Sequence, residues 1–340
     1  MVGFGLASIR LIQGKMDSRM RLLRSVIAAI AVTLVTLSGH SAWSQATRTI
    51  KIVVPYAAGG GTDVLARQLA EQIGQAQGRS MLIENRPGAS TIIGTEAVSR
   101  AAPNGATLLI TDPAFLINPH LRKVNYDPVT SFEPICHLAS SPLIISVNNA
   151  SPYRTLADFF DAARARPGDL TLAAAGPASI TQIAFETLKR AAKVDINFIP
   201  YPGGAPSINA LLGEHVTSAL TDYPPVGEQL KAGKLRALAT TSRTRIEWLP
   251  EMPTVSETVY KDFEADNWFA LYAPAKTARQ SVSQLAGWFT AALEVPEVKA
   301  KLVSLGLFPV GMCGADFIAF IRNKYQEYGR AIREFNLKAD

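Results

Sequence analysis

Cysteine is scarce in this sequence, and its few histidines are scattered. Only Cys136 and Cys313 occur among the 340 residues, and neither belongs to the CxxC spacing of a redox or zinc site. Two cysteines this far apart in sequence do not by themselves indicate a disulfide. We therefore interpret them as two small buried residues and keep a bond as the alternative. His120, His137 and His215 lie far apart, without the HxxxH or HExxH spacing of zinc ligands. We therefore expect no metal and no cofactor.

Signatures of common enzyme classes are also missing. The sequence contains neither the GxGxxG fingerprint of a dinucleotide-binding fold nor a phosphate-binding GK[ST] loop. It also lacks the GxSxG elbow of the α/β-hydrolases. An enzyme would need a convergent nucleophile and base, and the sequence supplies no evident pair. We therefore predict that the protein is not an enzyme.

Long apolar runs are rare as well. The main one, residues 26–37, is about 12 residues long, which is short for a membrane span of roughly 20 residues. Three arginines between positions 19 and 24 precede it, and a small polar stretch ending in Ala42-Trp43-Ser44 follows. This order predicts a secretory signal peptide over residues 1–44, in which residues 1–15 are an upstream extension. A membrane anchor is the alternative. We expect the remainder to be a soluble periplasmic protein.

The basic charge of the chain is concentrated in that leader. Its five basic residues against Asp17 account for a net +4 of the whole chain's +6, which leaves about +2 for residues 45–340. The overall charge therefore gives no support for nucleic-acid binding.

From Thr49 onward, short apolar segments alternate with amphipathic ones. This order is typical of a parallel sheet covered by helices on both faces. The expected strands are residues 50–54, 81–84, 107–110, 143–147, 170–174, 196–199, 216–221, 235–240 and 268–273. The expected helices are residues 62–75, 90–101, 155–166, 179–192, 207–213, 282–293, 296–305 and 316–335.

No long linker or charge block divides the chain. We therefore expect an α/β body of two lobes, each a mostly parallel sheet flanked by helices, joined by a hinge of two crossing strands near residues 146–149 and 266–271. Lobe 1 is then discontinuous, with residues 45–147 and 269–340, and lobe 2 comprises residues 148–268. Such an arrangement lets the lobes open and close about the hinge.

One arrangement of residues occurs twice. An apolar strand runs into Pro-Tyr, then a glycine cluster, then a helical pattern, first over Ile50–Asp63 and again over Ile196–Ser207. Each copy places unpaired backbone N–H groups and the positive end of a helix dipole at the C-terminal edge of a sheet, where anions bind. Two such sites facing each other would form a receptor for a small organic acid.

Several polar residues near these turns have both a structural and a ligand-binding interpretation. Thr62 and Ser179 can each cap a helix and still offer a hydroxyl to a ligand. Asp63 lies in a first helical turn, where a carboxylate is favoured by the helix dipole, and Asp222 presents the same choice between structure and ligand. We favour Tyr56 for ligand contact, whereas Trp268 is better interpreted as hinge packing.

Several short motifs follow one another along the chain after the leader. They are Val54–Asp63, Glu84–Ala89, Gly94–Val98, Asn118-Pro119, Tyr126–Pro128, Tyr201–Pro206 and Leu249–Thr254. In these motifs and their order the chain resembles the Bug receptors, the periplasmic binding components of tripartite tricarboxylate transporters. The resemblance covers essentially all of the chain after the leader.

This resemblance implies a type II-like periplasmic-binding-protein fold, no catalysis, and capture of a small carboxylate between the lobes by backbone, hydroxyl and water donors. It also implies inner-membrane transporter subunits as partners, and we expect a monomer. The first-lobe loop maps to Tyr56–Asp63, and the second-lobe loops map to residues 174–182 and 201–205. The full set of expected ligand-binding residues is Tyr56, Ala57, Gly59, Gly60, Gly61, Thr62, Asp63, Ala89, Ser90, Ser179, Thr181, Gln182, Gly203, Gly204, Ala205 and Asp222.

The sequence departs from the family pattern where ligand identity is decided. Ser90-Thr91-Ile92-Ile93 replaces a stretch that is usually glycine-rich, and Ala173–Ser179 replaces a glycine- and serine-rich loop. Gln182 stands where a histidine is common. These departures leave the expectation of a carboxylate ligand unchanged, but the sequence does not identify the particular acid. An exported enzyme acting on a small carboxylated substrate and a sensor domain for a membrane kinase are the alternatives.

Overall fold

The computed structural model describes residues 49–177, 179–246 and 249–338. The predicted signal peptide, and its alternative of a membrane anchor, lie outside these ranges. Within them, no helix combines the length and the apolar character that crossing a membrane requires.

The first sheet begins with three parallel strands, β1 (Ile50–Val54), β2 (Met81–Asn85) and β3 (Thr107–Thr111). Helix α2 (Gly61–Gln77) connects β1 to β2, and α3 (Ile92–Ser99) connects β2 to β3. Gly78 follows the last residue of α2, and its left-handed backbone (φ +60°) turns the chain so that the N–H of Arg79 donates to the Gly74 carbonyl at 3.3 Å.

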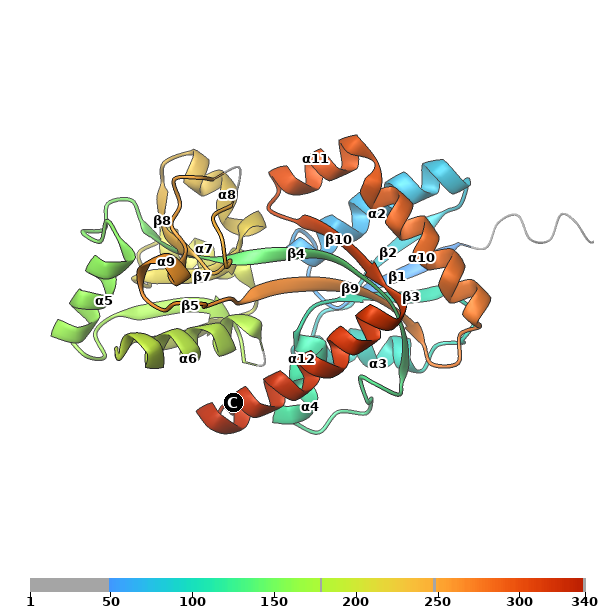
Figure 1. Ribbon diagram of the computed structural model, residues 1–340, viewed down its shortest axis with the longest axis horizontal. Coiled ribbons are helices and arrows are strands. Elements are labelled where there is room, and N and C mark those ends of the chain that lie inside the picture. The colour runs from blue at the N-terminus through green and yellow to red at the C-terminus, as the bar shows by residue number, and fades with distance from the viewer. Residues whose placement is uncertain (1–48, 178, 247–248, 339–340) are drawn as a thin grey trace, which may run out of the picture. The chain divides into compact units, whose positions relative to one another are not determined.

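The long strand β4 (Phe132–Asn148) belongs to two sheets (Figure 1). Up to Pro142 it pairs with β9 (Asp266–Pro274) in the first sheet, and from Leu143 it pairs with β7 (Ser218–Asp222) and β8 (Leu235–Thr240) in the second. The strand therefore changes sheets a few residues before the crossing expected at residues 146–149. The start of β9 coincides with the expected second crossing.

The second sheet repeats the plan of the first. Its parallel strands run in the order β6–β5–β7, and β7 and β8 both pair antiparallel with β4. Helices α5, α6, α7 and α8 connect the strands. Their bounds are β5 (Thr171–Ala175), β6 (Asn197–Tyr201), β7 (Ser218–Asp222), β8 (Leu235–Thr240), α5 (Leu156–Ala165), α6 (Ile180–Ala192), α7 (Gly204–Leu212) and α8 (Tyr223–Lys231).

The expectation of mostly parallel sheets is wrong. The pairs of β1, β2 and β3 and those of β5, β6 and β7 are parallel, but every pair made by β4 or β9 is antiparallel. Each sheet is mixed because the crossing strands become members of the sheets they connect. A strand that leaves one sheet for the other runs against the parallel strands beside it.

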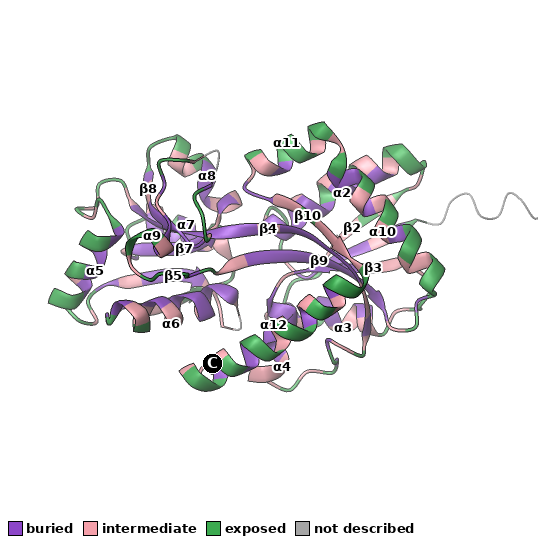
Figure 2. Ribbon diagram, viewed as in Figure 1, coloured by how far each residue is buried: buried purple, intermediate pink, exposed green. Residues whose placement is uncertain are grey.

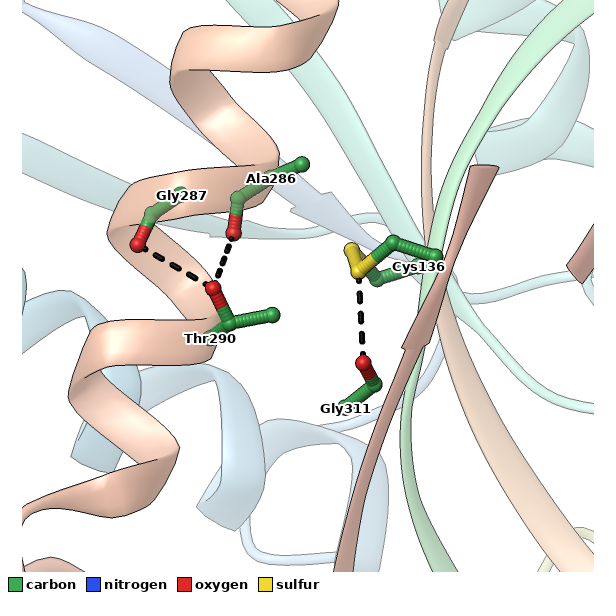
Figure 3. Close-up of a disulfide and its surroundings, with 6 residues drawn as sticks. Cys136, Ala286, Gly287, Thr290 and Gly311 are labelled. Atoms are coloured by element: carbon green, nitrogen blue, oxygen red, sulfur yellow. Dashed lines mark hydrogen bonds between the residues drawn. A yellow bond between two sulfur atoms is a disulfide. The ribbon is translucent and has the colours of Figure 1, made fainter. Parts of the chain in front are cut away.

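The C-terminal segment returns to the first sheet through α10 (Arg279–Glu294), α11 (Pro296–Ser304), β10 (Phe308–Cys313) and α12 (Gly314–Phe335). Strand β10 pairs antiparallel with β4, and Cys313 lies opposite Cys136 in that register. The two cysteines form a disulfide beside helix α10 (Figure 3), so the interpretation as separate buried residues is wrong. The pairing was not foreseen because β10 itself was not predicted.

Buried side chains concentrate along β4, β9 and the strands beside them, whereas the outer helical faces are exposed (Figure 2). Trp268 of β9 is almost fully buried, and its indole N–H donates to the hydroxyl of Tyr328 on α12 at 2.9 Å. This side chain therefore packs in the hinge region, as the sequence indicated.

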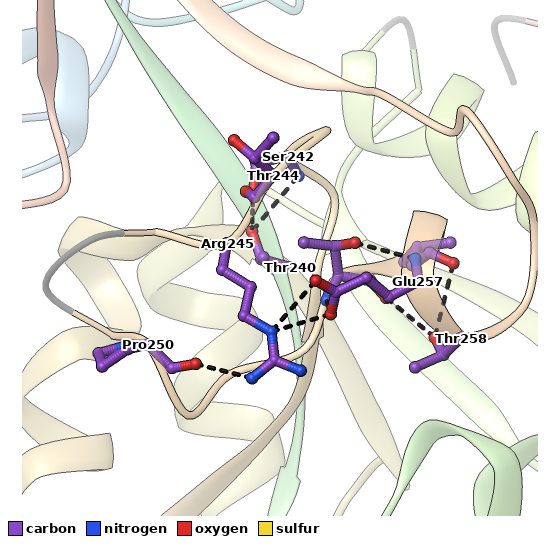
Figure 4. A network of polar contacts seen from close by, with 9 residues as sticks. Thr240, Ser242, Thr244, Arg245, Pro250, Glu257 and Thr258 are labelled. Carbon is purple, nitrogen blue, oxygen red and sulfur yellow. Dashed lines mark hydrogen bonds and ion pairs between the residues drawn. The ribbon is translucent and has the colours of Figure 1, made fainter.

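The Leu249–Thr254 motif forms a turn that is held by hydrogen bonds to two of its backbone carbonyls (Figure 4). The guanidinium of Arg245 bonds the Glu257 carboxylate and the Pro250 carbonyl, and Thr240 N–H donates to the Pro253 carbonyl. The turn leads into the short helix α9 (Val255–Thr258) through a reciprocal capping box between Thr254 and Glu257.

Thr254→Ala is expected to lower the free energy of unfolding by about 1 kcal/mol, because the substitution removes the hydroxyl that accepts from Glu257 N–H. Chemical denaturation of the variant and the wild type measures the difference. Thr258→Ser is the control, because it keeps a hydroxyl that can donate to the Thr254 carbonyl. Equal stability of Thr254→Ala and wild type would contradict the structural role of the capping box.

Candidate ligand-binding site

The two glycine turns meet at one carboxylate. A Cβ atom placed on Gly61 would lie 2.7 Å from Oδ2 of Asp222, and one placed on Gly204 would lie 3.6 Å from Oδ1 of the same side chain. Gly61 begins α2, which follows strand β1 of the first sheet, whereas Gly204 begins α7 and Asp222 ends β7 in the second sheet. The repeated sequence arrangement therefore comes together in space, on either side of Asp222.

The first turn begins its helix one residue earlier than expected. Gly60 is the N-cap of α2, and no side chain caps it, so the expected capping role of Thr62 is wrong. Thr62 lies in the first turn and is almost fully buried. Gly61 allows the close approach of Asp222 from the opposite lobe, and the backbone N–H groups of the first turn are left without a side-chain cap.

Asp63 is engaged by groups of the protein. Its Oδ2 accepts from the backbone N–H of Gly59 and from Nε of Arg67, each at 2.9 Å, and its Oδ1 accepts from the Asn85 amide at 2.8 Å. Burial alone would raise the pKa of Asp63, but the donors from Arg67, Gly59 and Asn85 outweigh it and the pKa is lowered. The carboxylate thus braces the loop between β1 and α2, and its contact with a ligand stays a prediction.

The loop before α3 has a backbone conformation that favours glycine, the residue type usual here in the family. Ala89, Ser90 and Thr91 all have positive φ, at 48°, 51° and 81°. Such backbone is costly for residues with a side chain, most of all for a β-branched threonine. The Asn118 amide donates to the Ser90 carbonyl at 2.6 Å and helps to hold the conformation. Of the residues that depart from the family pattern, Ser90 and Thr91 therefore occupy a strained left-handed run, whereas Ile92 and Ile93 belong to α3.

The second-lobe donor group lies at the start of α6. Ser179 is the N-cap, as predicted: its hydroxyl accepts from Gln182 N–H at 3.2 Å and donates to the Ala175 carbonyl at 2.9 Å. The hydroxyl of Thr181 lies 2.8 Å from that of Ser179. Ile180, between them, belongs to the same buried cluster as Trp268, so the start of this helix also packs against the hinge.

Two residues that the sequence analysis did not single out complete the cluster. The Tyr56 hydroxyl interacts with Asp112, which follows β3, and the side chain of Asn267 on β9 interacts with Asp222; each interaction favours the ionised carboxylate and lowers its pKa. Burial raises the pKa of Asp112 to about 6. Burial and the neighbouring charge of Asp112 raise the pKa of Asp222 to about 6 as well.

Asp112 could have been found from the sequence. It follows the predicted strand over residues 107–110, and ligands of open α/β sheets bind beyond the carboxyl ends of parallel strands. Asn267 carried no such signal, because its position depends on how β9 crosses between the sheets.

The structure brings Tyr56, Gly61, Gly204 and Asp222 together, and the hydrogen bonds of Ser179 and Thr181 stay within the second lobe. Ala57, Gly59, Ala89 and Ala205 are exposed, and Gly60, Ser90, Gln182 and Gly203 are half-buried. Ligand contact stays a prediction for the whole set.

Two sheets joined by a shared crossing strand, with a glycine turn from each at one place, define a two-lobed periplasmic-binding-protein fold. Residues 65–337 match the family described as tripartite tricarboxylate transporter family receptor. The chain belongs to this family of solute-binding receptors, and its resemblance to the Bug receptors is confirmed.

Individual relatives are similar to this chain over nearly their full length. Protein BugT of Bordetella pertussis is 30% identical over 319 residues, which are 93% of this chain and 98% of BugT. The solved structure of R. palustris Rpa4515 with adipate is 29% identical, with a TM-score of 0.82 over 87% of this chain and 99% of the other. MatC from Rhodopseudomonas palustris with bound malate is 26% identical, with a TM-score of 0.76 over 84% and 98% of the two chains.

Proposed function

We propose that this protein captures a small organic carboxylate between its two lobes in the periplasm and delivers it to inner-membrane subunits of a tripartite transporter. The observation that carries the proposal is the convergence of two glycine turns, one from each sheet, on the same place. Adipate and malate in the related structures are both small dicarboxylates, which supports this class of ligand.

Neutral donors suit a receptor that must release its ligand. Backbone N–H groups at the starts of α2, α6 and α7 attract a carboxylate through hydrogen bonds and the helix dipoles. We propose that the lobes, residues 45–147 with 269–340 and residues 148–268, close on the ligand by bending of β4 and β9. We also propose that the chain reaches the periplasm through cleavage of the leader over residues 1–44, and that it performs no catalysis.

Native mass spectrometry of the freshly purified protein tests the proposal by identifying any acid that co-purifies. Calorimetry with the identified acid then measures the stoichiometry. We expect one ligand retained unchanged per chain, and a ligand at 100 times its dissociation constant should add roughly 2.7 kcal/mol to the free energy of unfolding. Turnover of the acid, or no binding by any organic acid, would contradict the proposal.

Ser179→Ala is expected to weaken acid binding about tenfold without unfolding the protein. The substitution removes a hydroxyl from the anion-binding end of α6 and also removes a helix cap. Calorimetry measures the affinity, and thermal melting measures the stability.

Thr155→Ala is the matched control, because Thr155 is the N-cap of α5 and its hydroxyl accepts from Asp158 N–H. Both variants should lose about 1 kcal/mol of stability, but only Ser179→Ala should lose affinity. Equal affinities of the two variants would argue against a ligand-binding role for Ser179.

A further inference from the structure

A second close approach between the lobes lies outside the glycine turns. Gly306 stands in the turn between α11 and β10, in the lobe of the first sheet (Figure 1). A Cβ atom placed on Gly306 would lie 2.4 Å from Cβ and 2.7 Å from Cγ of Tyr223. Tyr223 begins α8 in the other lobe and directly follows Asp222, which approaches Gly61. Two consecutive residues of one lobe therefore each approach a glycine of the other.

Both partners of this approach are buried. Tyr223 is 3% exposed and belongs to the core cluster of the second sheet, whereas Leu302 and Leu307, which flank the Gly306 turn, belong to that of the first. The ring of Tyr223 also lies against Gly227 of its own helix, where an added Cβ would lie 2.4 Å from Cε1. The tyrosine side chain is therefore held between one glycine of its own lobe and one of the opposite lobe.

Gly306 also ends a helix. Its backbone is left-handed, with a φ of +71°, and its N–H donates to the Val303 carbonyl at 2.8 Å. The N–H of Leu307 donates to the Leu302 carbonyl at 2.9 Å. This is the Schellman pattern, in which glycine is favoured just after the end of a helix. The pattern accounts for the left-handed glycine, but it does not require a second lobe to pack against that glycine.

Gly233 has the same local conformation without a partner from the other lobe. It follows α8 with a φ of +65°, and its N–H donates to the Leu230 carbonyl at 3.0 Å. The N–H of Lys234 donates to the Gln229 carbonyl, also at 3.0 Å. No atom lies within 4 Å of a Cβ placed on Gly233. The two glycines therefore share their backbone conformation and hydrogen bonds, and only Gly306 is approached by the opposite lobe.

We propose that Tyr223 and Gly306 form a latch, a contact that holds the two lobes together beside the ligand site and raises the affinity for every acid by a common factor. The inference rests on the proposed function, because only a ligand bound between the lobes gains affinity from their contact. The apparent dissociation constant of a receptor is its intrinsic constant divided by the fraction of molecules in the binding-competent arrangement. A buried tyrosine seated on glycine raises that fraction, because it buries a large apolar area with few rotatable bonds.

Gly306→Ala is the variant that should open the latch. The nearest atom to the added methyl is Cβ of Tyr223, whose position is set by the backbone, so no change of rotamer makes room for it. Gly233→Ala is the matched control, because it places alanine in the same left-handed helix end with open space around it. Both variants should lose a similar amount of stability, and melting curves check that each is folded.

Pulsed electron paramagnetic resonance measures the distance between the lobes without any ligand. Spin labels attached at Glu228→Cys on α8 and Lys299→Cys on α11 occupy exposed positions, and the two native cysteines are bonded to each other. With no acid added, we expect a short-distance population in the wild-type background and in Gly233→Ala. Gly306→Ala should lose most of that population to longer distances. A wild type without the short distance, or the same distribution in both variants, would overturn the inference.

Calorimetry with malate and with adipate gives the second readout. For each acid that the wild type binds, Gly306→Ala should lower the affinity roughly tenfold and by the same factor, as expected for overpacking between the lobes. Gly233→Ala should bind as the wild type does. An unchanged affinity of Gly306→Ala, or a factor that differs between the acids, would overturn the latch and leave the proposed function standing. A wild type that binds no acid at all would contradict the proposed function, whereas the distances would still decide on the latch.

Tyr223→Ala tests the other side of the contact and replaces Gly306→Ala if that variant does not fold. It removes the ring, so the short-distance population should shrink here as well. Leu230→Ala is the control for lost packing, because Leu230 lies on the same helix and packs against the same core cluster. Leu230→Ala should lower the melting temperature without changing the distances. Equal distance distributions in these two variants would overturn the inference.

Discussion

Gly61→Ala is expected to weaken ligand binding by roughly tenfold to hundredfold while the protein stays folded. The added methyl would lie 2.7 Å from Oδ2 of Asp222 and 3.2 Å from the ring of Phe269. Phe269 is buried on β9, so the added methyl must be accommodated by a shift of the Asp222 side chain or of the lobe that carries it. Overpacking of this kind costs about 1–3 kcal/mol. Here the cost opposes the approach of the two lobes, so it should appear as weaker ligand binding.

Gly60→Ala is the matched control for that substitution. Gly60 is the neighbouring residue of the same turn, its φ of −81° suits alanine, and no atom lies within 4 Å of an added Cβ. Calorimetry with the acid found by native mass spectrometry compares the two variants with wild type. Equal affinity for Gly61→Ala and Gly60→Ala would show that the contact between Gly61 and Asp222 has no part in binding.

Removal of the disulfide by Cys136→Ala with Cys313→Ala is expected to lower the free energy of unfolding by roughly 2–5 kcal/mol. The bond joins β4 to β10 across 177 residues of sequence, so it restricts a very long loop of the unfolded chain. Calorimetry should show a melting temperature lower by roughly 5–15 °C.

Reducing agent supplies the control for this prediction. It should lower the melting temperature of the wild type toward that of the double variant and leave the double variant unchanged. Ligand affinity should change little, because the bond lies at β10 and not at the glycine turns. A wild type that melts at the same temperature with and without reductant would contradict a stabilising role for the bond.

Where sequence reasoning failed, proline was involved in most cases. Helix α4 (Ala114–Leu121) contains Pro119, α8 has two prolines in its first turn, and β10 carries both proline and glycine. The first part of β4, which includes Pro134 and Pro142, was also missed. Local propensity argues against regular structure at each of these places. Tertiary packing overrides it. The α8 prolines fall in the first turn, and Pro134 and Pro309 stand next to register shifts of their strands, whereas Pro119 is accommodated inside α4.

The candidate site shows the same division between local and distant effects. The sequence placed two glycine turns and a capping serine at helix starts, because such turns depend on a few neighbouring residues. It left open whether Asp63 and Asp222 face a ligand. Only the fold separates them, since Asp63 is bonded by Arg67 within its own lobe and Asp222 reaches the opposite one.

The amino-acid sequence by itself determined the alternation of strands and helices, the anion-binding turns and the family. The tertiary structure alone decided that β4 is shared by two mixed sheets, that Cys136 meets Cys313, and that Asp222 reaches Gly61 of the opposite lobe. The reason is the distance in sequence over which each kind of interaction acts. Periodicity and turn chemistry act over a few residues, whereas the pairing of segments a hundred or more residues apart follows from the packing of the whole chain.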